Sequence, residues 1–575
     1  MYSLEKYKKE IVRVINQTLK QKLVKASDLV YPPDKKMGDI SLPCFNISKE
    51  LGKSPAEVAK ELVAKIKIDS ISSALTAGPY LNFKIKINIL AKDLITEINK
   101  KSVDYGKNKS GKKKKVLLEY SNANTHKEYH VGHLRNISYG DAVNRVLKAN
   151  GYKSIPVSYI NDFGIHVAKT LWALNEFFKD KKPGENRGEF LAQVYVKGAK
   201  ESKDNEVNKR MVEGMMKKIE TRKGEEFKLW EKTRKWSIDQ FSQIYKELGV
   251  EFEHIFYESE YIEEGKKLIP KLVGNGILKE SQGAIIADLE EFDLGVLVVL
   301  RSDGTATYPV ADIPLAVAKQ KKYQADTSAY IVDIAQSLYL KQLFKILELI
   351  GQKEELKHLA YEFVKLPGGA MSSRTGNIVP YEELKQKLMD KAVAETKERH
   401  PDWNEDKVIS VAKTLALSAM KFEMIKVGAN QIITFDIKKA LEFSGYTATY
   451  LLYTVARINS IFKKAHSTQH TTRNIQHATH STNFEVLKEE SEHRLLMQVA
   501  KYPEVVGQAG EKMDPSGIAK FLFALAQDFN DYYHQIPVLK AEEDIREARL
   551  ALLQSIRTVL QNGLELLGIT TLEEM

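Results

Sequence analysis

Cysteine is almost missing from this chain of 575 residues, which contains only Cys44. A single thiol excludes an intrachain disulfide framework and a zinc site built from several cysteines. Long apolar runs are missing as well, since the densest short stretch, residues 295–300, is far below the roughly 18 residues of a membrane-spanning helix. We therefore expect no membrane anchor, and a reducing compartment, the cytoplasm.

Two further motifs are incomplete. Gly52, Lys53 and Ser54 fit the end of a phosphate-binding P-loop, but Ile47 stands where its first glycine is needed. The N-terminal residues mix apolar and charged side chains and lack the unbroken apolar core of a signal peptide. Their spacing favours an amphipathic surface helix instead.

The composition is that of a soluble protein with several cores, with 43% hydrophobic and 28% charged residues. The length indicates two to four domains. The formal net charge of +11 favours a polyanionic partner, because lysine and arginine neutralise phosphates, but it does not identify that partner.

The pattern along the chain divides it into four parts. Residues 1–106 mix helices and short strands, including a helix that Ser54 caps, and residues 107–115 form a basic linker that is either solvated or in contact with RNA. Residues 116–390 alternate strands with helices, which predicts a parallel sheet with crossover helices, and residues 170–270 read as a helical insertion. Residues 391–575 show helical periodicity, except for a polar insert at 466–483.

The strongest chemical signal is the tetrapeptide His130-Val131-Gly132-His133, placed where a strand gives way to a helix over residues 132–150. The start of a helix attracts anions, because its N–H groups are free and its dipole end is positive. Imidazoles at that point can donate hydrogen bonds to phosphate oxygens, and Gly132 leaves room for a flat base. Taken alone, the motif is better explained by two histidines that cap a helix.

A second signal is the turn of Met371, Ser372, Ser373 and Arg374, which precedes a helix that begins near Tyr381. Its hydroxyl groups and its cation are suited to binding phosphates. Together the two motifs resemble the HIGH and KMSKS signatures of class I aminoacyl-tRNA synthetases. In that family the signatures hold the ATP phosphates while an amino acid carboxylate attacks the α-phosphorus, so the protein supplies positioning and charge stabilisation.

The second motif departs from the family pattern, because Ala370 stands at its first lysine and Arg374 at its last. Arginyl-tRNA synthetases with an incomplete signature carry a lysine just upstream of HIGH, and Lys127 holds that place here. The resemblance thus assigns catalysis to Lys127, His130, His133 and Arg374. It assigns ATP binding to His130, Gly132, His133, Met371, Ser372 and Ser373.

The amino acid pocket is also similar to that of arginyl-tRNA synthetases, in E-Y-S-N-A-N from Glu119, in Y-P-V-A-D from Tyr308, and in V-D-I-A-Q ending at Gln336. Glu119 and Asp312 are two carboxylates that could converge on a guanidinium, a bidentate and charge-assisted pairing. The resemblance places Tyr308 beside the substrate side chain and Asn124 and Gln336 near its α-amino group. One departure is Tyr339, where many relatives have histidine.

The resemblance covers nearly the whole chain. It implies a Rossmann-type α/β catalytic domain, an α+β N-terminal tRNA-binding accessory domain and, over residues 391–575, an all-helical anticodon-binding domain of the DALR type, whose naming helix the segment YLLYTVARIN resembles. It also implies ATP with Mg²⁺, L-arginine and tRNA as reactants, adenylation that requires bound tRNA, and a monomer.

Three alternatives stay open. A class I synthetase for another amino acid shares the phosphate signatures, although a pair of carboxylates argues against an apolar substrate. A non-catalytic RNA-binding descendant is another, although the intact motifs argue against it. Lastly, the histidines of the polar insert could hold zinc by residue type, but its low complexity favours a loop (His466, His470, His477 and His480).

Overall fold

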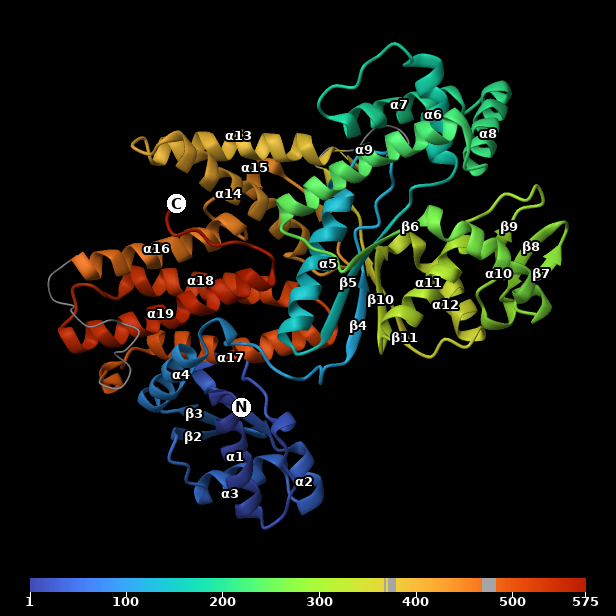
Figure 1. Ribbon diagram of the computed structural model, residues 1–575. Coiled ribbons are helices and arrows are strands. Elements are labelled where there is room, and N and C mark those ends of the chain that lie inside the picture. The colour runs from blue at the N-terminus through green and yellow to red at the C-terminus, as the bar shows by residue number, and fades with distance from the viewer. Residues whose placement is uncertain (367–368, 371–378, 468–481) are drawn as a thin grey trace.

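The structure is a computed structural model that describes residues 1–366, 369–370, 379–467 and 482–575. Figure 1 shows an N-terminal part, a central sheet with helices around it, two insertions and a helical C-terminal part. Among the described residues, no helix combines the length and the hydropathy needed to cross a membrane.

The N-terminal part is a small α+β unit. Its antiparallel sheet has the order β1-β3-β2, formed by Ile40–Pro43, Tyr80–Ile85 and Ile71–Ala77. The helices that pack around it are α1 (Ser3–Leu19), α2 (Phe45–Leu51), α3 (Pro55–Lys65) and α4 (Ile87–Lys101). The predicted cap is confirmed: Ser54 Oγ accepts the Glu57 N–H at 3.3 Å, and the Glu57 carboxylate accepts the Ser54 N–H at 3.0 Å.

Five parallel strands form the central sheet, in the order β11-β10-β4-β5-β6. They comprise Glu355–Tyr361, Thr327–Asp333, Lys115–Glu119, Lys153–Ile160 and His254–Tyr257. Crossover helices flank them: α5 (Val131–Ala149), α11 (Pro309–Tyr323) and α12 (Ser337–Leu349). The chain order reverses on either side of β4, and in such sheets ligands bind at this switch point, beyond the carboxyl ends of the strands. The predicted α/β fold is therefore confirmed.

Two insertions interrupt the sheet, and the sequence predicted only one of them correctly. Helices lie between β5 and β6, as predicted: α6 (Ile165–Phe177), α7 (Arg187–Glu201), α8 (Glu206–Glu220) and α9 (Gly224–Leu248). The predicted helical range 170–270 also includes β6, which is too short for its period to show. After α10 (Ile262–Gly274), an unpredicted antiparallel sheet follows: β7 (Lys279–Ser281), β8 (Ala284–Asp288) and β9 (Val296–Leu300).

The C-terminal part is almost wholly helical, as predicted. Its helices are α13 (Tyr381–Arg399), α14 (Glu405–Ile425), α15 (Ile437–Ala440), α16 (Ala448–Ser467), α17 (Glu490–Lys512), α18 (Ser516–Gln535) and α19 (Glu543–Leu566). Three short strands join it to the sheet region: β12 (Val364–Leu366), β13 (Gly369–Ala370) and β14 (Ile433–Thr434). Helix α13 runs across residue 390, where the sequence placed a boundary. Most of the polar insert, residues 468–481, lies outside the described residues.

The basic segment 107–115 is more ordered than a solvated linker. Its lysines 109 and 112–114 are exposed, but its backbone is fixed to the end of α5. Asn108 and Gly111 donate N–H hydrogen bonds of 2.8 Å to the carbonyls of Ala149 and Asn150. Because Asn150 also donates to the Val506 carbonyl at 2.9 Å, this point joins the catalytic and C-terminal parts.

Candidate active site

The two histidines of the HVGH motif form the N-terminus of α5. His130 is the N-cap residue in an extended conformation, and its Nδ1 accepts the Gly132 N–H at 3.1 Å. The Nδ1 of His133 accepts the His130 N–H at 3.2 Å, and the two ring centroids are 3.9 Å apart. Since each Nδ1 accepts a hydrogen bond, the proton of each neutral ring resides on Nε2.

Both rings are neutral at physiological pH. Burial, and then the charge of Lys127, lower the pKa of His130 to about 4. The pKa of His133 lies well below its ordinary value for the same main reason, burial, with His130 and Lys127 as further causes. The helix therefore presents two Nε2–H donors and its own free N–H groups, a combination suited to an anion.

Gly132 has a steric role that the sequence did not indicate. A Cβ at this position would lie 2.9 Å from Cε1 and 3.0 Å from Nδ1 of His130. Any other residue would therefore displace the His130 ring. The glycine keeps the capping imidazole in place, whether or not a base also approaches here.

Lys127 is positioned by a residue that sequence reasoning missed. His126 is fully buried with a left-handed backbone, φ 63°. Its N–H donates to Ser237 Oγ at 3.0 Å, and its ring nitrogens lie 2.9 Å from Thr125 Oγ1 and 2.8 Å from Thr233 Oγ1. Ser237 and Thr233 belong to α9, so the helical insertion fixes the backbone just before Lys127.

The Lys127 side chain also contacts this insertion. Its Nζ lies 5.3 Å from the ring centroid of Tyr195 on α7. No local pattern could have identified His126, Thr233 or Tyr195, because each acts through a contact over a long stretch of chain. The only visible signal was the position of Lys127 itself.

Glu119, at the end of β4, is buried together with Lys319 of α11. Its Oε2 forms an ion pair with Lys319 Nζ, and its Oε1 accepts a hydrogen bond from Asn122 Nδ2 at 3.3 Å. The sequence analysis placed Glu119 opposite a guanidinium without a competing cation. In the structure, Lys319 already neutralises much of its charge.

Asp312 is the less satisfied of the two predicted carboxylates. Its Oδ2 accepts a hydrogen bond from the Tyr339 hydroxyl, whereas its buried Oδ1 makes none with the described residues. The nearby Tyr159 hydroxyl does not reach hydrogen-bond geometry. Burial raises the pKa of Asp312 to about 6. Tyr339, the departure noted in the sequence, thus orients Asp312.

A third carboxylate, Glu258, was missed. It follows β6 directly, and its Oε2 accepts a hydrogen bond from Asn161 Nδ2 at 3.2 Å. Burial, and then the charge of Asp312, raise the pKa of Glu258 to about 8. A cationic side chain with several N–H donors would satisfy the unused carboxylate oxygens and restore the charged forms.

The other predicted pocket residues lie at the rim. Asn124 pairs with Asn161 in a parallel bridge beyond the ends of β4 and β5. Tyr308 precedes α11, is 64% exposed, and lies 6.4 Å from the Tyr339 ring in an edge-on arrangement. Gln336 is exposed at the end of a 3₁₀ turn before α12.

The predicted residues Met371, Ser372, Ser373 and Arg374 lie outside the described residues. The chain that follows them can be placed. Val131 donates its N–H to the Val379 carbonyl at 3.1 Å, and Tyr381 donates to the Tyr129 carbonyl at 2.8 Å. Residues 379–381 therefore lie against the HVGH motif, so the second motif rejoins the fold beside the first.

Comparisons with known proteins identify the family of each part of the chain. Residues 94–436 match the family described as tRNA synthetases class I (R), catalytic domain. Residues 5–85 match the arginyl tRNA synthetase N terminal domain, and residues 451–575 match the DALR anticodon binding domain.

Individual relatives match along nearly their whole length. The Arginine--tRNA ligase of Bdellovibrio bacteriovorus is 34% identical over 95% of this chain and 94% of its own, and that of Halothermothrix orenii is 31% identical over 99% and 100%. The solved arginyl-tRNA synthetase of Thermus thermophilus has 27% identity and a TM-score of 0.79, over 99% of this chain and 100% of its own. This chain therefore belongs to the arginyl-tRNA synthetase family of class I aminoacyl-tRNA synthetases.

Proposed function

We propose that this protein is an arginine–tRNA ligase that works in translation. It activates L-arginine with ATP, giving arginyl-adenylate and pyrophosphate, and then transfers the arginyl group to the 3′ end of its tRNA. The observation that carries the substrate assignment is the half-satisfied carboxylate of Asp312, which lies near Glu258, directly after the edge strand β6. Full-length similarity to proteins named Arginine--tRNA ligase supports the same function.

In the proposed activation step, the ATP phosphates lie at the N-terminus of α5. The Nε2–H groups of His130 and His133 donate to phosphate oxygens, and the cation of Lys127 offsets the charge that develops on the pentacoordinate phosphorus. The arginine carboxylate attacks the α-phosphorus, and pyrophosphate leaves with the electrons of the broken P–O bond. No covalent enzyme intermediate is needed, so fixed donors supply most of the stabilisation.

Arg374 remains the proposed second cation, and Met371, Ser372 and Ser373 remain proposed ATP contacts. Their place beside α5 is supported by the pairing of residues 379–381 with residues 129–131. Mg²⁺ is proposed to enter with ATP, bound to phosphate oxygens and water. The described residues contain no cluster of three or more His, Cys, Asp or Glu side chains that could hold a metal.

Arginine is proposed to bind with its guanidinium at Asp312. Glu258 adds a second carboxylate, and Glu119, which shares its charge with Lys319, completes the acidic wall. Tyr308 would then cover the substrate side chain, and Asn124 and Gln336 would bind its α-amino end. Such a pocket rejects amino acids without a cation, because the buried carboxylates would remain unpaired.

The remaining parts receive the roles that the family implies. We propose that residues 1–106 and 391–575 bind tRNA as accessory and anticodon-binding domains around the catalytic part at 116–390, with the exposed lysines of residues 107–115 near the RNA. A boundary at residue 390 would cut α13, which is one continuous helix from Tyr381 to Arg399. We further propose a cytoplasmic monomer.

The test is ATP–pyrophosphate exchange with each of the twenty amino acids, with and without total tRNA. We expect exchange with arginine alone, and only in the presence of tRNA. Exchange with a different amino acid would refute the pocket assignment. A folded protein that binds tRNA but supports no exchange would be a non-catalytic RNA-binding relative.

A further inference from the structure

A fully buried carboxylate close to the candidate site has no part in the proposed reaction. It belongs to Asp162, which lies just beyond the end of β5, and both of its oxygens are engaged. Oδ1 accepts the Ser259 N–H at 2.8 Å, whereas Oδ2 accepts the Ser259 hydroxyl at 2.8 Å and the Nε–H of Arg234. Burying a carboxylate is costly unless its oxygens are paired, and this set of donors supplies the pairing.

The contacts of the Asp162–Arg234 ion pair lie on both sides of Glu258. Ser259, which donates twice to Asp162, is the next residue in the chain. Tyr257 is the last residue of β6, and its ring centroid lies 4.2 Å from the Arg234 guanidinium. The ion pair therefore fixes the chain immediately before and immediately after the Glu258 carboxylate.

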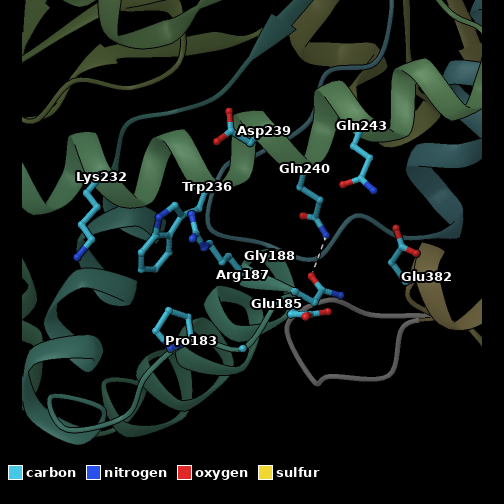
Figure 2. Close-up of a pocket in the computed structure, with 12 residues that line it drawn as sticks. Pro183, Glu185, Arg187, Gly188, Lys232, Trp236, Asp239, Gln240, Gln243 and Glu382 are labelled. Carbon is cyan, nitrogen blue, oxygen red and sulfur yellow. Dashed lines mark hydrogen bonds between the residues drawn. The ribbon is translucent and has the colours of Figure 1, made fainter.

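Arg234 belongs to α9, the long helix of the insertion between β5 and β6. Trp230, one turn earlier on α9, donates its indole N–H to the Asp162 carbonyl at 2.8 Å. Figure 2 shows a different face of this helix, where Trp236 and Gln243 line a pocket. Helical spacing puts residues 230 and 234 opposite that face, so their contacts to Asp162 anchor α9 to the sheet without involving the pocket.

Helix α9 supports the two halves of the site through separate contacts. Thr233 and Ser237 hold His126, which precedes Lys127 in the proposed phosphate-binding loop. The contacts to Asp162 instead support the segment that carries the proposed second carboxylate. Loss of the ion pair alone leaves the contacts to His126 in place, so arginine binding should be affected separately from ATP binding.

The charge of Asp162 also acts on Glu258. Burial, then the charge of Asp312, and further the charge of Asp162 raise the pKa of the Glu258 carboxyl to about 8. The remaining ionisable groups that face this carboxyl come from three elements (Asp312 of α11, Tyr159 of β5 and Tyr339 of α12). Because Arg234 offsets the charge of Asp162, removing one or the other should shift the ionisation of Glu258 in opposite directions.

We propose that Asp162, in its pair with Arg234, is a positioning residue for the selection of arginine. The pair fixes residues 257–259, so that the Glu258 carboxylate stays near Asp312 and meets the guanidinium of the substrate. Asp162 itself does not touch the substrate. The inference rests on the proposed function, because it takes arginine as the ligand of these carboxylates.

The experiment is steady-state ATP–pyrophosphate exchange by the full chain with saturating tRNA, at varied arginine and at varied ATP. Asp162→Asn keeps an acceptor for the Ser259 N–H but loses the acceptor for Arg234, so Glu258 should be held less firmly. The arginine KM should rise about 10-fold to 100-fold, the range for a hydrogen bond with a charged group, while the ATP KM stays within about twofold. A folded variant with an unchanged arginine KM, or with both KM values raised equally, would overturn the proposal.

The pH profile of the arginine KM gives a readout that a role confined to folding would not move. Asp162→Asn removes a negative charge near Glu258, so the KM should level off at a lower pH than in the parent enzyme. Arg234→Gln leaves that charge unpaired, so the KM should level off at a higher pH, and Arg234→Lys should restore the parent profile. Shifts in the same direction in Asp162→Asn and Arg234→Gln would overturn the proposal.

A matched control is Glu492→Gln. Glu492 is also fully buried and paired with the Nε of an arginine, Arg549 at 2.7 Å, but it lies on α17 in the C-terminal part. Its substitution should lower the free energy of unfolding as Asp162→Asn does, yet leave the arginine KM unchanged. An equal rise in the arginine KM in both variants would reduce the effect to a general loss of stability and overturn the proposal.

A milder variant covers the case in which Asp162→Asn does not fold. Ser259→Ala removes only the hydroxyl donor to Asp162 and should raise the arginine KM about threefold, the size of one hydrogen bond, and no rise would overturn the proposal. Wild-type protein without arginine-dependent exchange would refute the proposed function itself. Wild-type exchange together with an unchanged arginine KM in the variants would refute only the role of Asp162.

Discussion

Burial shifts the pKa values of two parts of the site in opposite directions. We call His130 and His133 the histidine side, and Asp312, Glu258 and Glu119 the carboxylate side. At the start of α5, burial lowers the pKa of His130 to about 4, so the rings act as neutral donors. At the ends of the strands, burial raises the pKa of Asp312 to about 6 and that of Glu258 to about 8. The histidine side therefore has its hydrogen bonds formed before any ligand binds, because each Nδ1 accepts a backbone N–H. The other side holds acids that are costly to ionise until a cation arrives.

This difference indicates how specificity and rate are divided between the two sides. Prearranged donors lower the barrier of a charged transition state without needing to move. Carboxylates without hydrogen-bond partners stabilise a bound neutral side chain only weakly, whereas they stabilise a bound guanidinium strongly. The histidine side should therefore determine the rate, and the carboxylate side the choice of amino acid.

The largest effect is expected from a substitution that changes the carboxylate side alone. Asp312→Asn keeps an oxygen for the Tyr339 hydroxyl but removes the charge, so arginine recognition should lose about 4 kcal/mol, roughly 1000-fold in kcat/KM for arginine. The KM for ATP should stay within about twofold. Steady-state exchange at varied arginine and ATP measures both. An unchanged arginine KM would contradict the pocket.

The same variant should be more stable than the parent enzyme. A carboxyl whose pKa is raised from 3.8 to about 6 on folding destabilises the fold progressively as the pH rises from the first value to the second. At pH 8 the neutral amide should therefore gain up to about 3 kcal/mol in the free energy of unfolding. Denaturant unfolding at pH 8 and pH 5 would show whether the gain falls to about half in mild acid, as a folded pKa of about 6 and an unfolded pKa of 3.8 require.

The two sides also differ in how far the sequence could predict them. His130, Gly132 and His133 are neighbours on one helix end, so their capping geometry follows from local sequence. The acidic pocket depends on pairs such as Glu119 with Lys319, 200 residues apart, and Asp312 with Tyr339, 27 apart. No local period encodes such contacts. Glu258 was missed for this reason, and Lys319 changed the role expected of Glu119.

The second prediction concerns the buried pair on the carboxylate side. Lys319→Met leaves the Glu119 carboxylate buried without a cation and should reduce the free energy of unfolding by about 3 kcal/mol. Adding Glu119→Gln should recover most of the loss, since a neutral pair replaces an uncompensated charge. Urea unfolding of the two single variants and the double variant gives the coupling. Additive losses would mean that the two side chains are independent.

The third prediction isolates the proton on the histidine side. In His133→Asn, the amide oxygen takes the place of Nδ1 and still accepts the His130 N–H, but no donor reaches the position of Nε2. Adenylation should slow about 100-fold, close to 2.7 kcal/mol, with unchanged thermal stability. His133→Gln extends an N–H₂ to the Nε2 position and should lose less. Equal losses in both variants would contradict the assignment of the proton to Nε2.

The smallest effect is a pH dependence that only the carboxylate side should show. Below pH 6 the Asp312 carboxyl of the free enzyme takes up a proton that arginine must displace, so the arginine KM should rise about tenfold for each pH unit lost. The groups that face this carboxyl are Glu119, Lys319, Glu258, Tyr159 and Tyr339. Between pH 6 and pH 8, ionisation of Glu258 should lower the KM further until it levels off above pH 8, and Glu258→Gln should remove that upper change alone. The KM for ATP should stay flat over the same range, because the low pKa of His130 keeps its ring neutral from pH 5 upward. If the two KM values changed together with pH, the two sides would not be electrostatically separate.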